Sequence, residues 1–160
     1  MTTDVTPLID IELDHEDWLE ALPDAAACIR TAIEATFAHL GVKEQLDIVV
    51  LLADDAELKS LNKEFRQKNA PTNVLSFPAP EMMHPHLGDM ALGFETCVRE
   101  AAEQGKTLKA HLMHLTVHGA LHLLGYDHIT EAEAEDMESL ERTILLGLDI
   151  ADPYAYGTTD

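Results

Sequence analysis

The stretch HLMHLTVHGALHLLGYDH, residues 111–128, constrains the fold more than any other part of the sequence. Successive residues of an α-helix advance by about 100°, so four of these histidines share one narrow stripe. They are His111, His114, His118 and His122. Leucine and valine occupy the other faces, which makes the helix apolar nearly all round. Such a helix is buried, and we expect the rest of the chain to pack around it.

Strands are expected mostly early in the chain and helices mostly late. Alternating or β-branched apolar residues predict four strands, at 8–13, 46–52, 74–77 and 87–92. Helical spacing of apolar residues, with capping boxes at Asp54–Glu57 and Thr130–Glu133, predicts about five helices. They run from Asp24 to Leu40, from Asp54 to before Pro71, and over 95–104, 107–124 and 131–146. This order is typical of an α+β fold, a small mixed β-sheet covered by helices.

The chain of 160 residues has the length of one domain, which we expect to span 1–160, with a core of about 8–148 and short polar tails. No apolar run approaches the ~20 residues of a membrane helix. The N-terminus lacks the basic and apolar segments of a signal peptide. Cys28 and Cys97 are the only cysteines, a number that fits a reducing compartment. These features predict a cytoplasmic protein without membrane association.

The net charge is −20, from 30 acidic and 10 basic residues. Such acidity predicts repulsion from nucleic acids, so a nucleic-acid partner requires a local basic exception. Lys59, Lys63 and Arg66 provide one, because they share a face of the predicted helix. The planar guanidinium of Arg66 can hold a phosphate in two places. The two lysines either assist it or simply form a solvated helix face.

Three histidines have the spacing of a metal site. His118 and His122, at i and i+4, can share one zinc ion, which holds imidazole nitrogens at roughly 2.0–2.1 Å. The third ligand must come from beyond the helix. Gly125 can adopt positive φ and end the helix, so that His128 can turn back. Three imidazoles leave a coordination position for water, as in catalytic zinc sites, and we predict one Zn²⁺ here.

The other histidines carry weaker signals. We interpret His111 and His114 as structural residues or as supports for the metal ligands. His84 and His86 lie in a methionine-containing loop and are expected at the surface. Asp127 either orients His128 or caps a turn.

The histidine spacing coincides with the HExxHxxGxxH motif of metzincin proteases. Those enzymes use the glutamate as general base, but here Gly119 occupies that position and cannot transfer a proton. Peptide hydrolysis by the usual route therefore lacks its base. Zinc lowers the pKa of its bound water to about 7, so a phosphodiester can be attacked without a neighbouring carboxylate. No residue near the three histidines is an evident general base.

Four segments in order resemble the YbeY family of bacterial metal-dependent endoribonucleases. They are Asn62-x3-Arg66, PTNVLSFP at 71–78, LGDM at 87–90 and HGALHLLGYDH at 118–128, within a matching stretch of about 46–148. The resemblance implies an α+β fold, a zinc ion held by His118, His122 and His128, and a substrate-side Arg66. Asn69 departs from the family pattern, in which an aspartate is expected.

The resemblance also implies a role in 3′-end maturation of 16S rRNA and in ribosome quality control, in the cytoplasm. The expected partners are rRNA and the small ribosomal subunit, reached directly or through a protein, and not DNA. We expect catalysis from Arg66 and the three metal-binding histidines. The predicted substrate-binding residues are Arg66, Lys59, Lys63, Asn73 and Ser76. The alternatives are a zinc metallopeptidase with a non-standard base and a non-catalytic, zinc-stabilised ribosome-binding factor.

Overall fold

The computed structural model describes residues 7–127 and 129–154. Its four strands are β1 (Leu8–Leu13), β2 (Asp47–Ala53), β3 (Val74–Pro78) and β4 (His86–Gly93). They form one sheet in the order β1-β2-β4-β3. β1, β2 and β4 are parallel, whereas β3 is antiparallel to β4. The expected small mixed sheet of four strands is therefore confirmed.

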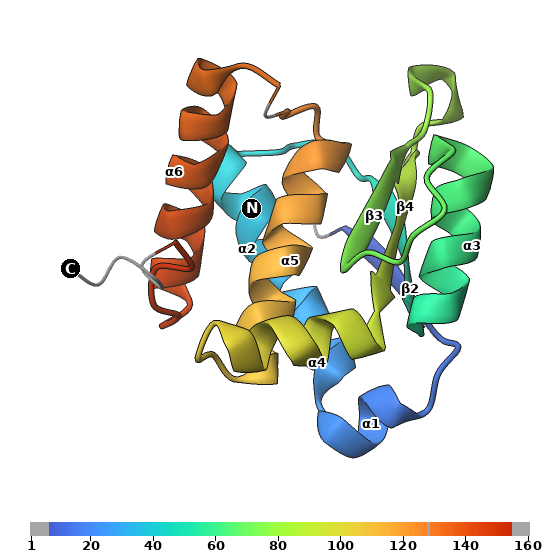
Figure 1. The fold of residues 1–160 in the computed structure, drawn as a ribbon. Helices are drawn as coiled ribbons and strands as arrows, with labels where there is room; N and C mark the ends of the chain where they lie inside the picture. The colour runs from blue at the N-terminus through green and yellow to red at the C-terminus, as the bar shows by residue number, and fades with distance from the viewer. Residues whose placement is uncertain (1–6, 128, 155–160) are drawn as a thin grey trace.

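Helices cover both faces of the sheet (Figure 1). They are α1 (Asp17–Ala21), α2 (Ala25–Leu40), α3 (Asp55–Arg66), α4 (Phe94–Glu103), α5 (Leu108–Leu123) and α6 (Glu131–Gly147), with a 3₁₀ turn η1 (Glu81–Met83). α3 lies on one side of the sheet, and α5 lies on the other side with α2. α6 packs against α5 and α2 beyond them. The α+β class is confirmed.

α5 is the central helix, as its sequence predicts. It contacts α2, α4, α6, β3 and β4, and ten of its residues are buried, including Leu112, Val117 and Leu121. Thr107 caps its first turn, accepting a hydrogen bond from the Ala110 amide at 3.0 Å. The histidine stripe of α5 is consequently fixed between the sheet and α6.

One helix was not expected. α1 has only five residues, too few for an apolar period to be read from sequence. A single anchor holds it: Trp18 is fully buried, and its indole Nε1 donates to the Ala53 carbonyl at 2.8 Å. The described residues therefore contain six α-helices where we expected about five.

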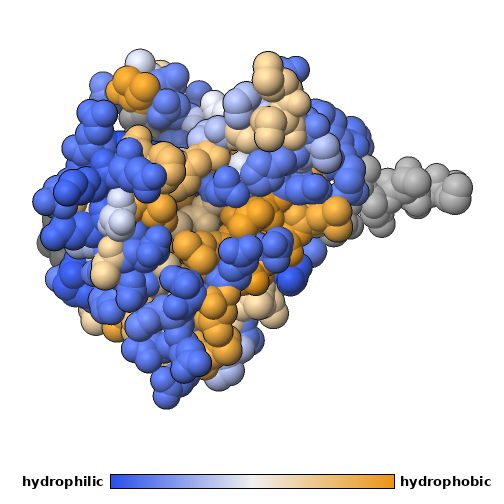
Figure 2. All heavy atoms as spheres, turned by 90° about the vertical axis from the view of Figure 1, so that its right-hand side faces the viewer, coloured by the Kyte–Doolittle hydropathy of each residue, from blue (hydrophilic) through white to orange (hydrophobic). Residues whose placement is uncertain are grey.

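Helices begin at both expected capping sites, and among the described residues the reciprocal capping box is complete only at α6. The Asp54 side chain accepts from the Glu57 amide at 2.9 Å. Thr130 and Glu133 form a complete capping box at the start of α6. Among the described helices, none is long and apolar enough to cross a membrane. The face that carries α3 is largely hydrophilic, with apolar residues gathered near its middle (Figure 2).

Candidate metal centre

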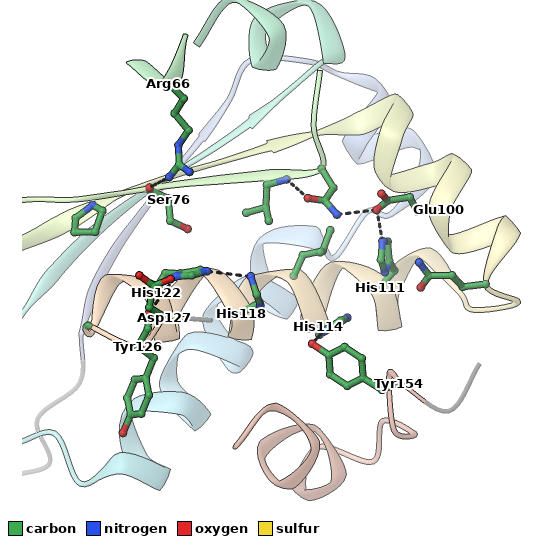
Figure 3. Close-up of a pocket in the computed structure, with 16 residues that line it drawn as sticks. Arg66, Ser76, Glu100, His111, His114, His118, His122, Tyr126, Asp127 and Tyr154 are labelled. Atoms are coloured by element: carbon green, nitrogen blue, oxygen red, sulfur yellow. Dashed lines mark hydrogen bonds and ion pairs between the residues drawn. The ribbon is translucent and has the colours of Figure 1, made fainter. Parts of the chain in front are cut away.

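A cavity of about 820 Å³ opens between α5 and β3 (Figure 3). Histidines of α5 form one wall, and Arg66 and Ser76 lie across from them. Asn73 also lines the cavity. The remaining lining comes from several elements, including β3, α4, α5 itself and the loop after α5. These residues are Val74, Pro78, Glu100, Gln104, Leu115, Gly125, Tyr126, Asp127 and Tyr154.

The hydrogen bonds made by the Nδ1 atoms of His118 and His122 determine whether their Nε2 atoms carry a proton or a lone pair. His122 Nδ1 lies 3.0 Å from the Tyr126 carbonyl, which can only accept, so this nitrogen carries the proton. His118 Nδ1 lies 2.7 Å from a carboxylate oxygen of Glu141 and likewise donates. In a neutral imidazole the second nitrogen then holds a lone pair. Both Nε2 atoms are therefore set as ligands rather than as donors.

The two Nε2 atoms lie 3.1 Å apart. When both hold lone pairs, neither can donate a hydrogen bond to the other, and a cation relieves their repulsion. Two nitrogens at roughly 2.0–2.1 Å from a tetrahedral zinc ion lie about 3.3 Å from each other. The spacing and the donor type therefore fit a divalent metal, as the i, i+4 pattern predicts.

The third predicted ligand, His128, lies outside the described residues. Gly125 has the positive φ that we expected, 103°, and it lies just after the end of α5. Within 7–127 and 129–154, no group of three histidine, cysteine or acidic side chains is placed to hold a metal ion. Two of the three predicted ligands are thus described, and they face the same point.

Glu141 of α6 is a fully buried carboxylate behind the histidines. It accepts hydrogen bonds from His118 Nδ1 at 2.7 Å, from His114 Nε2 at 2.8 Å and from the Tyr154 hydroxyl. Burial by itself raises the pKa of Glu141, but these hydrogen bonds outweigh it and lower the pKa to about 2. A charged Glu141 holds the His118 ring in its ligand orientation, as carboxylates do behind metal-bound histidines.

Arg66, at the end of α3, faces the histidines from the opposite wall of the cavity (Figure 3). Its Nη2 donates to the Ser76 carbonyl at 2.8 Å, and its Cζ lies 5.7 Å from the centre of the Phe77 ring. These contacts use one side of the guanidinium fork and fix its position. The remaining N–H groups can receive an anion.

The structure separates the other predicted substrate-binding residues. Asn73 and Ser76 line the cavity together with Arg66. Lys59 and Lys63 are exposed on α3 and are absent from the cavity lining. Although the sequence predicts that they share a helix face with Arg66, they do not reach the cavity. Of the three, only Arg66 extends past the end of α3 to contact β3.

Gly119 explains the missing glutamate. It is buried where α5 meets the sheet, and an added Cβ would lie 2.7 Å from Met90 Cε and 3.0 Å from Ser76 Oγ. A glutamate side chain does not fit there without separating α5 from β3 and β4. The proteolytic version of the motif is therefore incompatible with this packing.

Sequence reasoning missed Glu141, Tyr154 and Glu100. Glu141 lies 23 residues from His118 along the chain, and no local spacing marks it. The buried face of α6 offered one signal, since a glutamate among apolar positions requires a partner inside the protein. The supporting role expected for His114 agrees with its contact with Glu141, and that expected for His111 with its bond to Glu100 at 2.9 Å.

The fold and the site define a class: α+β proteins with a histidine-based candidate metal centre beside an arginine. The family model described as endoribonuclease YbeY matches residues 11–149. Since this match covers most of the chain, the protein belongs to the YbeY family.

Curated relatives agree, and each is named endoribonuclease YbeY. The relative from a Chelativorans species is 51% identical over 152 residues, covering 92% of this chain and 93% of the relative. Those from Azorhizobium caulinodans and Cereibacter sphaeroides are 49% and 46% identical, each covering 92% of this chain, and 96% and 99% of the relatives. The solution structure of a Thermotoga maritima protein has the same fold, with a TM-score of 0.55 at 22% identity over 96% of this chain and 99% of that one.

Proposed function

We propose that this protein is a metal-dependent endoribonuclease that cuts single-stranded RNA. Family membership supports the reaction class, because the relatives are named endoribonucleases. The observation that carries the proposal is the pair of Nε2 atoms 3.1 Å apart, both set as ligands, in the same cavity as the Arg66 guanidinium. A cationic centre and an arginine on facing walls suit a phosphodiester.

We propose that His118, His122 and His128 hold one zinc ion per chain. A bound zinc ion supplies an activated water and offsets negative charge on the phosphate. The carboxylate of Glu141 and the carbonyl of Tyr126 keep the two described imidazoles in their ligand tautomer. Arg66 binds and orients the phosphate from the opposite wall, since its free N–H groups match phosphate oxygens. The carbonyl of Ser76 accepts a hydrogen bond from Arg66 and thereby positions the guanidinium group.

The cellular role that we propose is 3′-end maturation of 16S rRNA and ribosome quality control in the cytoplasm. The partners are rRNA and the small ribosomal subunit. A net charge of −20 opposes capture of RNA by long-range attraction. Recruitment through a ribosomal protein therefore accounts better for specificity than a broad basic surface.

The two alternative functions are less well supported. A metallopeptidase requires a base beside the metal, and the position that supplies it in metzincins is the buried Gly119. A purely structural zinc site is closed by four protein ligands. The histidine pair instead lines an open cavity that also contains Arg66.

The test is cleavage of a single-stranded RNA by wild type, Arg66→Glu and His122→Ala, with metal content measured on all three. We expect Arg66→Glu to bind metal normally and to lose most activity, whereas His122→Ala loses both metal and activity. Lys59→Glu is the matched control, because it makes the same charge reversal on α3 outside the cavity. Equal cleavage by wild type and Arg66→Glu would contradict the proposal.

A further inference from the structure

We propose that Glu100 forms a second subsite in the cavity, which accepts a hydrogen bond from a nucleotide a few units away from the scissile phosphate. The proposal rests on the proposed endoribonuclease function. It assigns to α4 a part in substrate selection, separate from the metal centre on α5.

Glu100 is held in place by two donors. Its Oε1 accepts from Asn73 Nδ2 at 2.8 Å and from His111 Nε2 at 2.9 Å. His111 is only 2% exposed, and Asn73 is itself fixed because its Oδ1 accepts from the Val74 amide at 2.6 Å. The carboxylate is therefore tied to α5 and to the start of β3, and it cannot swing freely on α4.

The second oxygen of Glu100 differs from the first. Among the described residues, both hydrogen bonds to this carboxylate end on Oε1, and the side chain is 25% exposed. Glu100 also lines the cavity that contains Arg66 and the histidine pair. Oε2 is thus available to accept a hydrogen bond from a bound ligand.

Charge restricts what that ligand can be. A carboxylate repels a phosphate, so this end of the cavity cannot bind the backbone anion as Arg66 does. It can accept only from a donor, and a neutral donor on RNA is either a ribose 2′-hydroxyl or a base N–H group. Burial lowers the pKa of His111 and keeps its ring neutral, so its proton on Nε2 is committed to Glu100.

The distance along α5 suits a nucleotide a few units from the scissile phosphate on the same strand. His111 lies seven residues before His118 on the same stripe, which corresponds to about 10 Å at 1.5 Å per residue. Figure 3 shows Glu100 and His111 at one end of the row of side chains, with Arg66 and His122 toward the other. Stacked nucleotides rise by about 3.4 Å along a strand, so this separation corresponds to about three stacked units from the phosphate.

Glu100→Gln is a sharp test because the amide keeps the anchors. The Gln oxygen can still accept from Asn73 and His111, while its NH₂ group replaces Oε2 and turns an acceptor into a donor. We expect kcat/KM on single-stranded RNA to fall about 10- to 100-fold, as for a lost hydrogen bond to a charged group. Metal content and melting temperature should stay unchanged. Glu103→Gln, exposed on the same helix, is the matched control.

Two substrate series, cut by wild type, identify the donor. One replaces single 2′-hydroxyls by hydrogen around the scissile bond, and the other replaces single bases by analogues without the amino group. One substitution should lower wild-type cleavage by the same factor as Glu100→Gln and should have no further effect on the variant. If that substitution belongs to the first series, the donor is a ribose 2′-hydroxyl. If it belongs to the second, the donor is a base amino group.

Each remaining outcome is decisive. Unchanged cleavage by Glu100→Gln, or loss of metal in that variant, overturns the subsite and leaves the ribonuclease intact. If the variant does not fold, uniform wild-type rates across both series overturn it as well. A wild type that binds metal but cuts no RNA contradicts the proposed function instead.

Discussion

At the scale of single residues, the hydrogen bonds made by Nδ1 of His118 and His122 determine the protonation of Nε2 on the same rings. Tyr126 and Glu141 each take the Nδ1 proton of one imidazole, so the Nε2 atoms meet as two lone pairs 3.1 Å apart. The buried charge of Glu141 is maintained by three donors. Burying a carboxylate carries a large desolvation cost even when it is paired, so we interpret Glu141 as a functional residue that orients His118.

Replacing Glu141 by Gln should weaken metal binding about 10- to 100-fold, the usual effect of losing a support for a ligating histidine. An amide offers one acceptor oxygen where the carboxylate offers two. Either His118 or the His114–Tyr154 pair must then lose its acceptor. Competition with a chelating dye measures the affinity. Glu138→Gln, partly exposed on the same helix, should bind metal like wild type.

Most of the elements could be predicted from the sequence because their signals are local. The four strands begin and end within about one residue of expectation, α3 and α6 begin at the predicted capping residues, and the capping box of α6 is complete. His118 and His122 could also be predicted, since i, i+4 spacing on one helix brings them together. Glu141, Glu100 and Tyr154 could not, because their positions in the site depend on packing between elements.

At the scale of elements, α5 brings the site together because four other elements supply side chains around its histidine stripe. α3 supplies Arg66, β3 supplies Ser76, α4 supplies Glu100, and α6 supplies Glu141. The approach of α5 to the sheet depends on Gly119, where a Cβ would lie under 3.0 Å from Met90.

Gly119→Ala should lower the free energy of unfolding by about 1–3 kcal/mol, the usual cost of overpacking a core. Met90 is 1% exposed, so its terminal methyl has little room to withdraw. Denaturant unfolding measures the change. Gly119→Glu should fail to fold and should show no peptidase activity, and a folded variant that cut peptides would contradict this reading. Gly147→Ala is the control, because no described residue lies within 4 Å of its added Cβ.

The contact between α4 and α5 should make stability depend on pH. Burial lowers the pKa of His111 below its ordinary 6.5, so the unfolded chain binds this proton more readily than the folded one. Stability contributed by neutral His111 is thus present above about pH 6.5 and is lost as the pH falls below it. Relative to His111→Gln, which cannot titrate, wild type should lose stability between pH 7.5 and 5. Parallel curves for the two proteins in urea unfolding would contradict the expectation.

At the scale of the whole molecule, acidity and ribonuclease function oppose each other. The chain carries 30 acidic and 10 basic residues, yet the cavity presents Arg66 and a candidate cation site. Few phosphates can be neutralised at one time by so small a positive region. Binding of RNA should therefore be weak and local, and the fold should add specificity through contacts such as that of Glu100.

The dependence of RNA affinity on salt should accordingly be shallow. Each neutralised phosphate of a single strand contributes a slope of about −0.7 in log K against log salt. One or two contacts predict a slope of about −1, measured by fluorescence anisotropy with a short labelled RNA. Arg66→Ala should flatten it further, whereas Lys59→Ala with Lys63→Ala, outside the cavity, should change it less.

The most direct measurement of the central claim is RNA cleavage by protein stripped of metal and then reloaded with zinc. We expect the stripped protein to remain folded but inactive, because the core of α2, α5 and the sheet does not depend on the metal. Activity should return in proportion to bound zinc, up to one ion per chain, and His122→Ala should regain none. Full activity of the stripped protein, or zinc binding by His122→Ala equal to that of wild type, would contradict the account.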